Sequence, residues 1–173
     1  MPVTFAELET LAPTIAEFAR QKIVDTGLSL VGTTRSDGWP RVSGWELWIC
    51  DGRIYLGSMP NAVKVRDLRR DPRCCILTPL ADKDDLAGEA KLFCVAREVD
   101  DPEEWERARR TFEKERGFDM GPPGGSHLLE MSITGAAFQR VVGEDFRTTS
   151  WAEGGPVRER SRTGSLGESV ELT

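Results

Sequence analysis

The strongest constraint on the fold is a hairpin signal at residues 40–58, PRVSGWELWICDGRIYLGS. Two segments rich in β-branched and aromatic residues, 40–49 and 53–58, stand on either side of an Asp51-Gly52 pair. An Asp-Gly pair readily adopts the positive φ angles that a tight two-residue turn requires. The sequence therefore predicts two antiparallel strands joined directly, a local pairing that any fold of this chain must contain.

Further short strands are predicted on both sides of the hairpin. A β-rich segment at 28–34 precedes it, and a short helix at about 61–71, with Asn61 as its cap, follows it. Three more β-rich segments follow, at 73–80, 89–99 and 127–142. Because short antiparallel strands with clear turns are typical of small barrels, we predict a mainly β fold, a β-barrel with peripheral helices.

Helical signals lie at the N-terminus and in the second half of the chain. Thr4 followed by Glu7 is a capping-box pattern, and Pro13 starts a second helix that ends at about Thr26. A third helical segment starts at Asp101 with the run DPEE and continues to about residue 117.

These signals divide the chain into three parts. Residues 1–27 are predicted to be a helical lead-in, residues 28–151 a barrel domain, and residues 152–173 a C-terminal arm or mobile tail. The polar segment 81–88 is predicted to be an exposed loop.

The overall charge disfavours a nucleic-acid binder. The chain has 29 acidic and 23 basic residues, a net charge of −6, whereas binders of nucleic acid need a basic excess to neutralise phosphates. The apolar runs are far shorter than the ~18–20 residues that span a bilayer. The N-terminus lacks the basic and apolar regions of a signal peptide. We therefore expect a cytoplasmic protein that binds neither nucleic acid nor membrane.

The cysteines and the single histidine do not form a recognisable site in the sequence. Cys50, Cys74, Cys75 and Cys94 include no CxxC spacing, and we interpret them as buried apolar residues, with no metal site. His127 is interpreted as an ordinary residue at a strand start, and a haem-binding or catalytic role is the alternative. No catalytic residue is nominated.

A basic run at 57–73, GSMPNAVKVRDLRRDPR, suggests an anion site. Ser58 ends a strand and Lys64 lies near the start of the following helix, where unpaired N–H groups carry partial positive charge. Arg41 begins the neighbouring strand, and its guanidinium is placed to add a bidentate contact. We predict a pocket for one phosphate group and interpret the other arginines of the run as solvated.

The order of these motifs resembles the pyridoxamine 5′-phosphate oxidase-like superfamily, the flavin-binding split β-barrels. The resemblance is carried by TTRSDGWPRVSGWELWICDGRIYLGSMPNAVKVRDLRRDPR (33–73) and AKLFCVAREVDDPEEW (90–105), and it extends over residues 28–116. It implies a Greek-key type split barrel. It also implies a homodimer with two cofactor sites at the interface, each lined by both subunits.

The resemblance also implies the cofactor contacts. Arg41 and Lys64 correspond to the residues that hold the cofactor phosphate. The ring and ribityl chain are expected to lie along four further residues, Val42, Ser43, Gly57 and Ser58. The chain departs from the oxidases at Glu46, where they carry a basic residue, and it lacks their C-terminal Arg and His pattern. The substrate is therefore expected to differ from pyridoxine phosphate.

The function that the resemblance implies is a flavin-type oxidoreductase. FMN is the expected cofactor, the deazaflavin F420 is the alternative and haem is disfavoured; the cofactor transfers hydride to or from a small conjugated substrate. A non-catalytic flavin- or haem-binding protein of the same fold remains open. A nucleic-acid-binding regulator that uses the basic helix is the least favoured alternative, because the net charge has the wrong sign.

Overall fold

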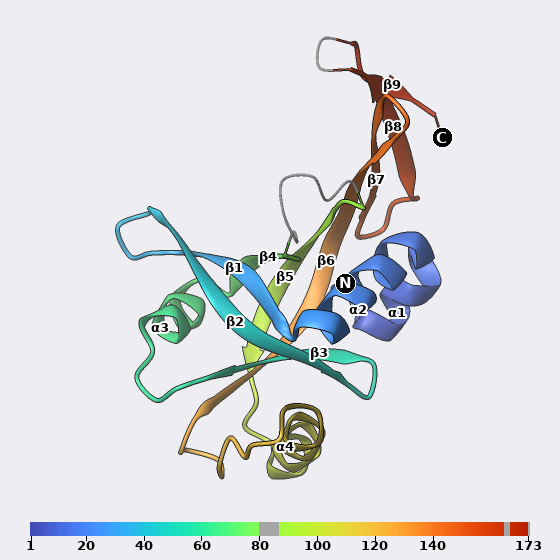
Figure 1. Cartoon of the computed structure of the whole chain (residues 1–173). Coiled ribbons are helices and arrows are strands. Elements are labelled where there is room, and N and C mark those ends of the chain that lie inside the picture. The colour runs from blue at the N-terminus through green and yellow to red at the C-terminus, as the bar shows by residue number, and fades with distance from the viewer. Residues whose placement is uncertain (80–86, 165–166, 173) are drawn as a thin grey trace.

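The computed structural model describes residues 1–79, 87–164 and 167–172 (Figure 1). The helices within these residues are α1 (Phe5–Leu11), α2 (Pro13–Thr26), α3 (Val63–Arg70) and α4 (Pro102–Arg116). The strands are β1 (Leu28–Thr34), β2 (Pro40–Cys50), β3 (Arg53–Ser58), β4 (Arg73–Leu77), β5 (Glu89–Glu98), β6 (His127–Val142), β7 (Asp145–Ala152), β8 (Arg158–Thr163) and β9 (Val170–Glu171). The loop predicted at 81–88 lies mostly outside the described residues.

Six antiparallel strands close into a barrel. They follow the order β3-β2-β1-β4-β5-β6, and β3 also pairs with β6, which completes the ring. Closure satisfies the backbone groups that an open sheet would leave at its edges. The predicted mainly β fold, a split barrel with peripheral helices, is confirmed.

The hairpin predicted from the Asp-Gly pair is present between β2 and β3. Asp51 and Gly52 have φ angles of 49° and 69°, and Cys50 pairs with Arg53 across the turn. A Cβ atom on Gly52 would lie 2.6 Å from the Cβ of Ala6 in α1. The turn therefore needs glycine both for its backbone angle and for the close approach of α1.

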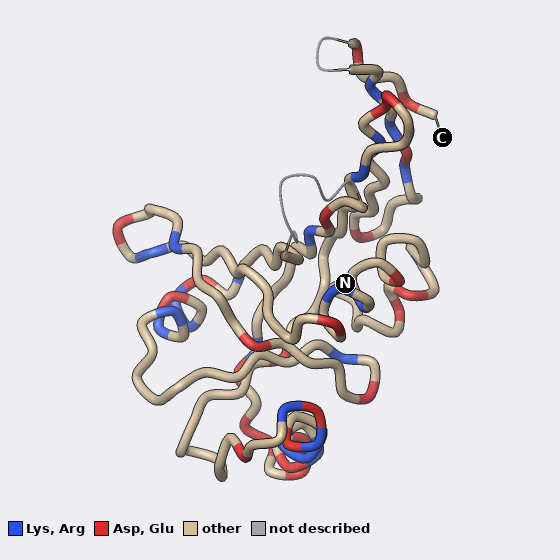
Figure 2. The backbone as a smooth tube through the Cα atoms, viewed as in Figure 1, with Lys and Arg blue, Asp and Glu red and all other residues tan. Residues whose placement is uncertain are grey.

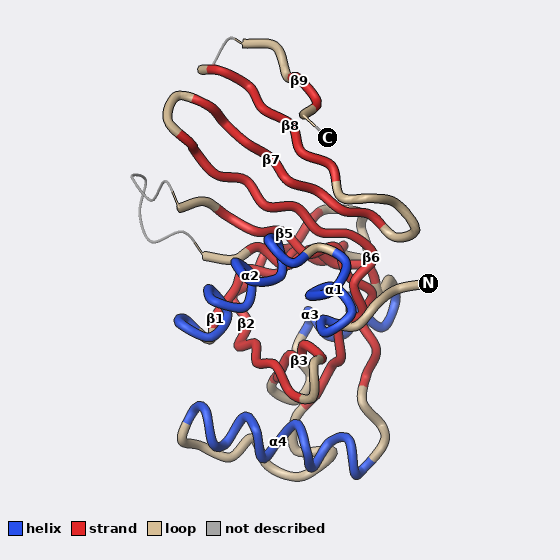
Figure 3. The backbone as a smooth tube through the Cα atoms, turned by 90° about the vertical axis from the view of Figure 1, so that its right-hand side faces the viewer, coloured by secondary structure: helices blue, strands red, loops and turns tan. Residues whose placement is uncertain are grey.

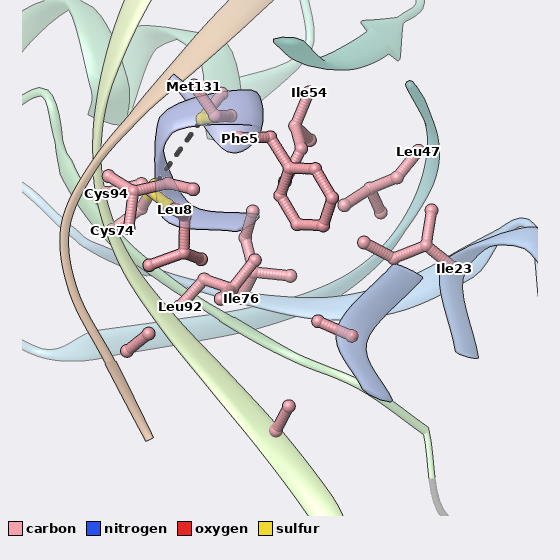
Figure 4. Packing of buried hydrophobic residues seen from close by; sticks show 14 of the residues in the cluster. Phe5, Leu8, Ile23, Leu47, Ile54, Cys74, Ile76, Leu92, Cys94 and Met131 are labelled. Carbon is pink, nitrogen blue, oxygen red and sulfur yellow. Dashed lines mark hydrogen bonds between the residues drawn. The ribbon is translucent and has the colours of Figure 1, made fainter. Parts of the chain in front are cut away.

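Helices α1 and α2 lie across the ring of strands (Figure 3). The capping box at the start of α1 is confirmed, because the backbone N–H of Glu7 donates to Oγ1 of Thr4 and the backbone N–H of Thr4 donates to the Glu7 carboxylate. Phe5, Leu8 and Ile23 are fully buried among barrel side chains (Figure 4). The N-terminal helices therefore complete the main core.

The two tryptophans of β2 are buried in different cores. Trp45 faces the main core inside the barrel, and Trp48 faces the opposite side of the strand. Its indole N–H donates to the carbonyl of Ala108 in α4, and its ring packs on Phe112 at a centroid distance of 4.7 Å. Helix α4 thus covers an outer face of the barrel.

Strand β6 continues beyond the barrel and begins a second sheet region. It pairs with β7, which is followed by β8 and β9, and these strands extend away from the barrel (Figures 1 and 3). Strand β6 runs unbroken through Gly135, and its register against β5 shifts between Phe93 and Cys94 of that strand. Helices of the described part of the chain are all too short or too polar to cross a membrane.

Candidate functional site

A pocket of about 480 Å³ opens where β3 leads into α3. One wall comes from the hairpin and the start of α3, and the other from α4 and the segment after it. Residues that line the pocket include Trp45, Glu46, Ser58, Lys64, Phe118 and Met120. The pocket is lined mainly by apolar and aromatic groups, with polar side chains in both walls: Glu46, Ser58 and Lys64 in the first, and Asp119 and Ser126 in the second. Pockets of this size and character typically take small molecules and cofactors.

Lys64 is the cationic group of this wall. Its ammonium donates to the carbonyl of Gly44 at 3.2 Å and lies 4.3 Å from the centroid of the Trp45 ring. Within the described part of the chain it forms no ion pair. Burial lowers the pKa of Lys64, and the nearby charge of Glu46 partly offsets this effect. A half-buried lysine without an acidic partner is well suited to hold an anionic ligand.

Two buried polar atoms in the same wall have no hydrogen-bond partner. They are Oγ of Ser58 and Nε1 of Trp45. Leaving such a group unpaired costs about 1–3 kcal/mol. Both residues line the pocket, so a polar ligand that reached these atoms would satisfy groups that the protein leaves unpaired.

The start of α3 adds further donors. Asn61 was predicted as its cap, but this prediction is wrong, because the N-cap is Ala62 and no side chain caps the helix. Asn61 instead adopts a left-handed backbone conformation with a φ of 63° in the preceding turn. The first N–H groups of α3 consequently remain available for an anion.

Arg41 lies outside the lining of this pocket. Its Nε donates to Oδ2 of Asp67 at 2.6 Å, and Asp67 also accepts from the hydroxyl of Thr33. Burial of Asp67 raises its pKa, but the hydrogen bond and charge of Arg41 outweigh burial, and the pKa lies below its usual range. The guanidinium expected to hold the phosphate is therefore paired with a carboxylate of α3.

The other predicted site residues divide into two groups. Gly57, Ser58 and Lys64 line the pocket together. Val42 and Ser43 do not line it; Val42 is exposed on the outer face of β2 and Ser43 is half-buried. The structure thus brings three of the six predicted residues into one pocket.

Three of the remaining arginines of the basic run have a carboxylate partner, and Arg66 is exposed. Arg69 pairs with Glu98, and Arg70 lies 3.6 Å from Asp67. Arg73 pairs with Asp71. All three stay exposed, and α3 itself carries four basic residues and one acidic residue, Asp67 (Figure 2). Most arginines of the run are therefore paired with carboxylates rather than gathered in an unpaired basic patch.

Glu46 places a negative charge in the pocket wall beside Lys64. The other acid of the lining, Asp119, is neutralised by Arg109 at 2.7 Å. The wall therefore carries one unpaired cation and one unpaired anion. This balance, with the apolar walls, fits a conjugated ligand that carries a single anionic group.

A flavin-type cofactor fits these residues. The aromatic and apolar walls suit its ring system, and Lys64, Ser58 and the uncapped start of α3 suit its phosphate. Among the described residues, no group of three or more His, Cys, Asp or Glu side chains is arranged to hold a metal ion. The buried thiols lie in the core, where burial is the main cause that raises the pKa of Cys50.

The neighbours of His127 form a group that the sequence does not predict. This residue lies directly opposite Ser58 in the pairing of β3 with β6. Its Nδ1 is 2.9 Å from Oε1 of Glu98, and the Glu98 carboxylate accepts two 2.7 Å hydrogen bonds from Arg69. No local pattern signals this group, because its members come from four separate elements.

Comparison with known proteins identifies the family. The model of the family described as pyridoxamine 5′-phosphate oxidase matches residues 15–140, which include the hairpin, α3 and most of the barrel. The chain belongs to this family. No functionally curated protein matches this member of the pyridoxamine 5′-phosphate oxidase family in sequence.

Solved structures of the same fold include proteins of several kinds. ChuZ of Campylobacter jejuni is 14% identical, with a TM-score of 0.69 over 90% of this chain and 65% of ChuZ. A Clostridium acetobutylicum protein related to general stress protein 26 is 14% identical, with a TM-score of 0.61 over 82% of this chain and 95% of that protein. A haem-binding protein from Mycobacterium smegmatis is 21% identical, with a TM-score of 0.56 over 87% of this chain and 58% of that protein.

These identities show a shared fold and no more. The chain spans 65% of the length of ChuZ and 58% of the length of the haem-binding protein. The function must therefore be inferred from the residues of the pocket and not from these similarities in fold.

Proposed function

We propose that this chain binds FMN in the pocket beside α3 and acts as a flavin-type oxidoreductase on a small conjugated substrate. The observation that carries the proposal is the grouping of the Lys64 ammonium with two unpartnered polar atoms, Ser58 Oγ and Trp45 Nε1, in one apolar pocket. Membership of the pyridoxamine 5′-phosphate oxidase family supports the choice of a flavin.

Each side chain has a binding role in this proposal. The Lys64 ammonium and the free N–H groups of α3 hold the cofactor phosphate, and Ser58 adds a hydrogen bond. Trp45, Phe118 and Met120 pack on the flat part of the cofactor and exclude water. The bound flavin supplies hydride transfer, and the protein supplies its position and a dry surrounding.

The single histidine of the chain favours flavin over haem. The Nδ1 of His127 is held by Glu98, and the side chain does not line the pocket. A haem iron would need an axial ligand directed into the ligand space, which this residue does not provide.

We also propose that the protein is a homodimer through the outer face of the barrel. Leu30, Val42 and Phe93 are 42%, 66% and 45% exposed. The strand registers place them on one face that crosses β1, β2, β4 and β5. An exposed apolar face of this kind is typical of an interface, and a second copy would cover it and approach the pocket from β2.

Cofactor titration tests the binding proposal. Purified protein is titrated with FMN, F420 and haem, followed by flavin fluorescence and by absorbance. We expect saturable FMN binding that Lys64→Ala weakens about tenfold or more, the effect of losing roughly 1.4 kcal/mol. Arg66→Ala is the matched control, because Arg66 is an exposed cation of the same helix and does not line the pocket.

The outcomes separate the alternatives. If F420 binds more tightly than FMN and its binding also depends on Lys64, F420 replaces FMN as the proposed cofactor and the proposed binding site is retained. Binding of neither flavin nor deazaflavin, or equal affinities for wild type and Lys64→Ala, would contradict the proposal.

Sedimentation analysis tests the dimer. Val42→Asp should produce a monomer with weakened FMN binding, because the partner would no longer complete the site. Val24→Asp is the control, since Val24 is 59% exposed on α2, away from this face. A dimer that persists in Val42→Asp and Phe93→Asp would contradict the proposed interface.

A further inference from the structure

Two polar groups without partners face each other across the junction of β3 and β6. Ser58 and His127 are directly opposite residues in this antiparallel pair, so their side chains lie on the same side of the sheet. Their Cβ atoms are therefore about 4.5–5.5 Å apart. Oγ of Ser58 is buried and unpartnered, and Nε2 of His127 has no hydrogen-bond partner among the described residues.

The imidazole of His127 is held from its other nitrogen. Nδ1 lies 2.9 Å from the Glu98 carboxylate, which can only accept, so Nδ1 carries a hydrogen and donates it. Arg69 is 3.5 Å from the same nitrogen and anchors Glu98 through two shorter bonds. In the neutral ring Nε2 is therefore an acceptor, and Ser58 has a hydroxyl hydrogen to donate.

The position of the pair ties it to the pocket. Ser58 lines the pocket, whereas His127 does not, and the neighbouring residue Ser126 does. The serine hydroxyl thus stands between the ligand space and the imidazole. A partly exposed carboxylate, an imidazole and a buried hydroxyl therefore follow one another from Glu98 to the pocket wall.

We propose that Glu98, His127 and Ser58 form a hydrogen-bonded relay that sets the direction of the Ser58 hydroxyl toward the ligand in the pocket. The proposal rests on the function proposed above for its coupling to FMN. The relay requires that rotation of the Ser58 side chain bring its hydroxyl within hydrogen-bond distance of Nε2.

The relay has two states that differ by one proton. With a neutral imidazole, the Ser58 hydroxyl donates to Nε2 and its oxygen is left to accept a hydrogen bond from a ligand donor. With a protonated imidazole, Nε2–H donates to Oγ, and the Ser58 hydroxyl donates to a ligand acceptor such as a phosphate oxygen. Binding an anionic ligand therefore takes up one proton at His127, and no covalent bond of the protein changes.

The charges around the imidazole agree with such a switch. Glu98 from β5 and Arg69 from α3 are the charged groups in contact with the ring, and Asp100 acts on Arg69. Glu98 and Arg69 carry opposite charges, so the three groups together carry about one positive charge when the ring is protonated. A bound anion nearby then favours the protonated state.

Nitrogen NMR of the ligand-free protein tests the contact directly. His127 is the single histidine of the chain, so its ring signals need no assignment among histidines. We expect a hydrogen on Nδ1 and a Nε2 resonance that Ser58→Ala displaces. Ser29→Ala is the matched control, because it removes another buried, unpartnered hydroxyl that lies outside the pocket.

Repeating the measurement with FMN tests the coupling. FMN should raise the titration midpoint of the His127 ring by about 0.5–1 pH unit in wild type and in Ser29→Ala, but not in Ser58→Ala. By linkage, FMN affinity should rise about three- to tenfold more from pH 8 to pH 6 in wild type than in Ser58→Ala. The phosphate of FMN titrates in the same range, and the comparison with Ser58→Ala cancels its contribution.

Failure of the relay and failure of the proposed function are distinguishable. FMN binding with an unchanged His127 midpoint would overturn the coupling and leave the proposed function standing. If FMN does not bind, the proposed function is wrong, and the NMR spectrum of the ligand-free protein still shows whether Ser58 contacts His127. A Nε2 resonance that is the same in wild type and Ser58→Ala would overturn the relay in either case.

Discussion

Nε of Arg41 in β2 lies 2.6 Å from Oδ2 of Asp67 in α3, and the Asp67 side chain is only 5% exposed. This ion pair binds the helix to the barrel and neutralises the arginine that the family resemblance assigns to the cofactor phosphate. The cation that the pocket retains is Lys64. In the proposed FMN site, the phosphate would therefore be held by one lysine together with helix and serine donors.

Removing Asp67 should destabilise the fold. Asp67→Ala leaves Arg41 without its carboxylate and Thr33 without its acceptor, and we expect a loss of about 2–3 kcal/mol in the free energy of unfolding. Urea denaturation measures this loss. Asp37→Ala is the control, because its ion pair with Arg35 is about half exposed on both sides and should change stability by less than about 1 kcal/mol.

The same pair gives a pH dependence. The pKa of Asp67 is lower in the folded protein, so its contribution to stability is present above the usual aspartate pKa and is lost as pH falls through the folded value. The difference in unfolding free energy between wild type and Asp67→Ala should therefore be constant above about pH 5 and shrink below about pH 4. A difference that does not change down to pH 2 would contradict this assignment.

Replacing Glu46 should strengthen phosphate binding. Glu46→Gln removes the negative charge of the pocket wall, and we expect FMN affinity at pH 7 to rise about fivefold, a change of roughly 1 kcal/mol. Because the charge of Glu46 raises the pKa of Lys64, the substitution should also shift the loss of binding at alkaline pH to a lower pH. Fluorescence titrations from pH 7 to pH 10 measure both effects, and Glu17→Gln, an exposed acid of α2, is the control.

Two glycine substitutions separate backbone strain from steric contact. Gly52→Ala and Gly143→Ala place a side chain at similar positive φ angles, 69° and 63°. The new Cβ would meet Ala6 at 2.6 Å in the first variant and nothing within 4 Å in the second. We expect Gly143→Ala to cost about 1 kcal/mol and Gly52→Ala about 1–3 kcal/mol more. Equal losses in thermal or urea unfolding would show that α1 can move away from the turn.

The thiols should react slowly in the native protein. The Cys74 thiol beside Cys94, together with burial, raises the pKa of Cys94, and burial also raises the pKa of Cys75. Cys75 is the one cysteine that is not buried. We therefore expect a single slow reaction with a thiol reagent, which Cys75→Ser removes, and full reaction after unfolding. Fast modification of Cys94 in the native protein would contradict this expectation.

Local signals in the sequence predicted the elements well. The Asp-Gly turn, the capping box at Thr4 and the start of α4 at Asp101 depend on side chains within a few positions of one another. The grouping of Gly57, Ser58 and Lys64 was predictable for the same reason, because a strand end and the next helix are adjacent in the chain.

Contacts between distant segments were not predictable in this way. The partner of Arg41 is on α3. The residue opposite Ser58 and the contact of Glu98 with His127 depend on how β3 and β5 pair with β6. Strand register and barrel closure determine these contacts, and neither can be read from a single sequence. The uncapped start of α3 also escaped prediction, because Asn61 was free to adopt a left-handed turn conformation instead of capping.

The pairing of β3 with β6 has a consequence for folding. These strands are far apart in the chain, so bringing them together carries a large loop-closure entropy and is expected to be a late event. Lys64 and Ser58 come from the first half of the chain, but Ser126, which lines the pocket, takes its place only when the neighbouring strand β6 pairs with β3. A chain whose barrel is still open therefore cannot assemble the site, and the appearance of ligand binding during refolding would time the closure of the barrel.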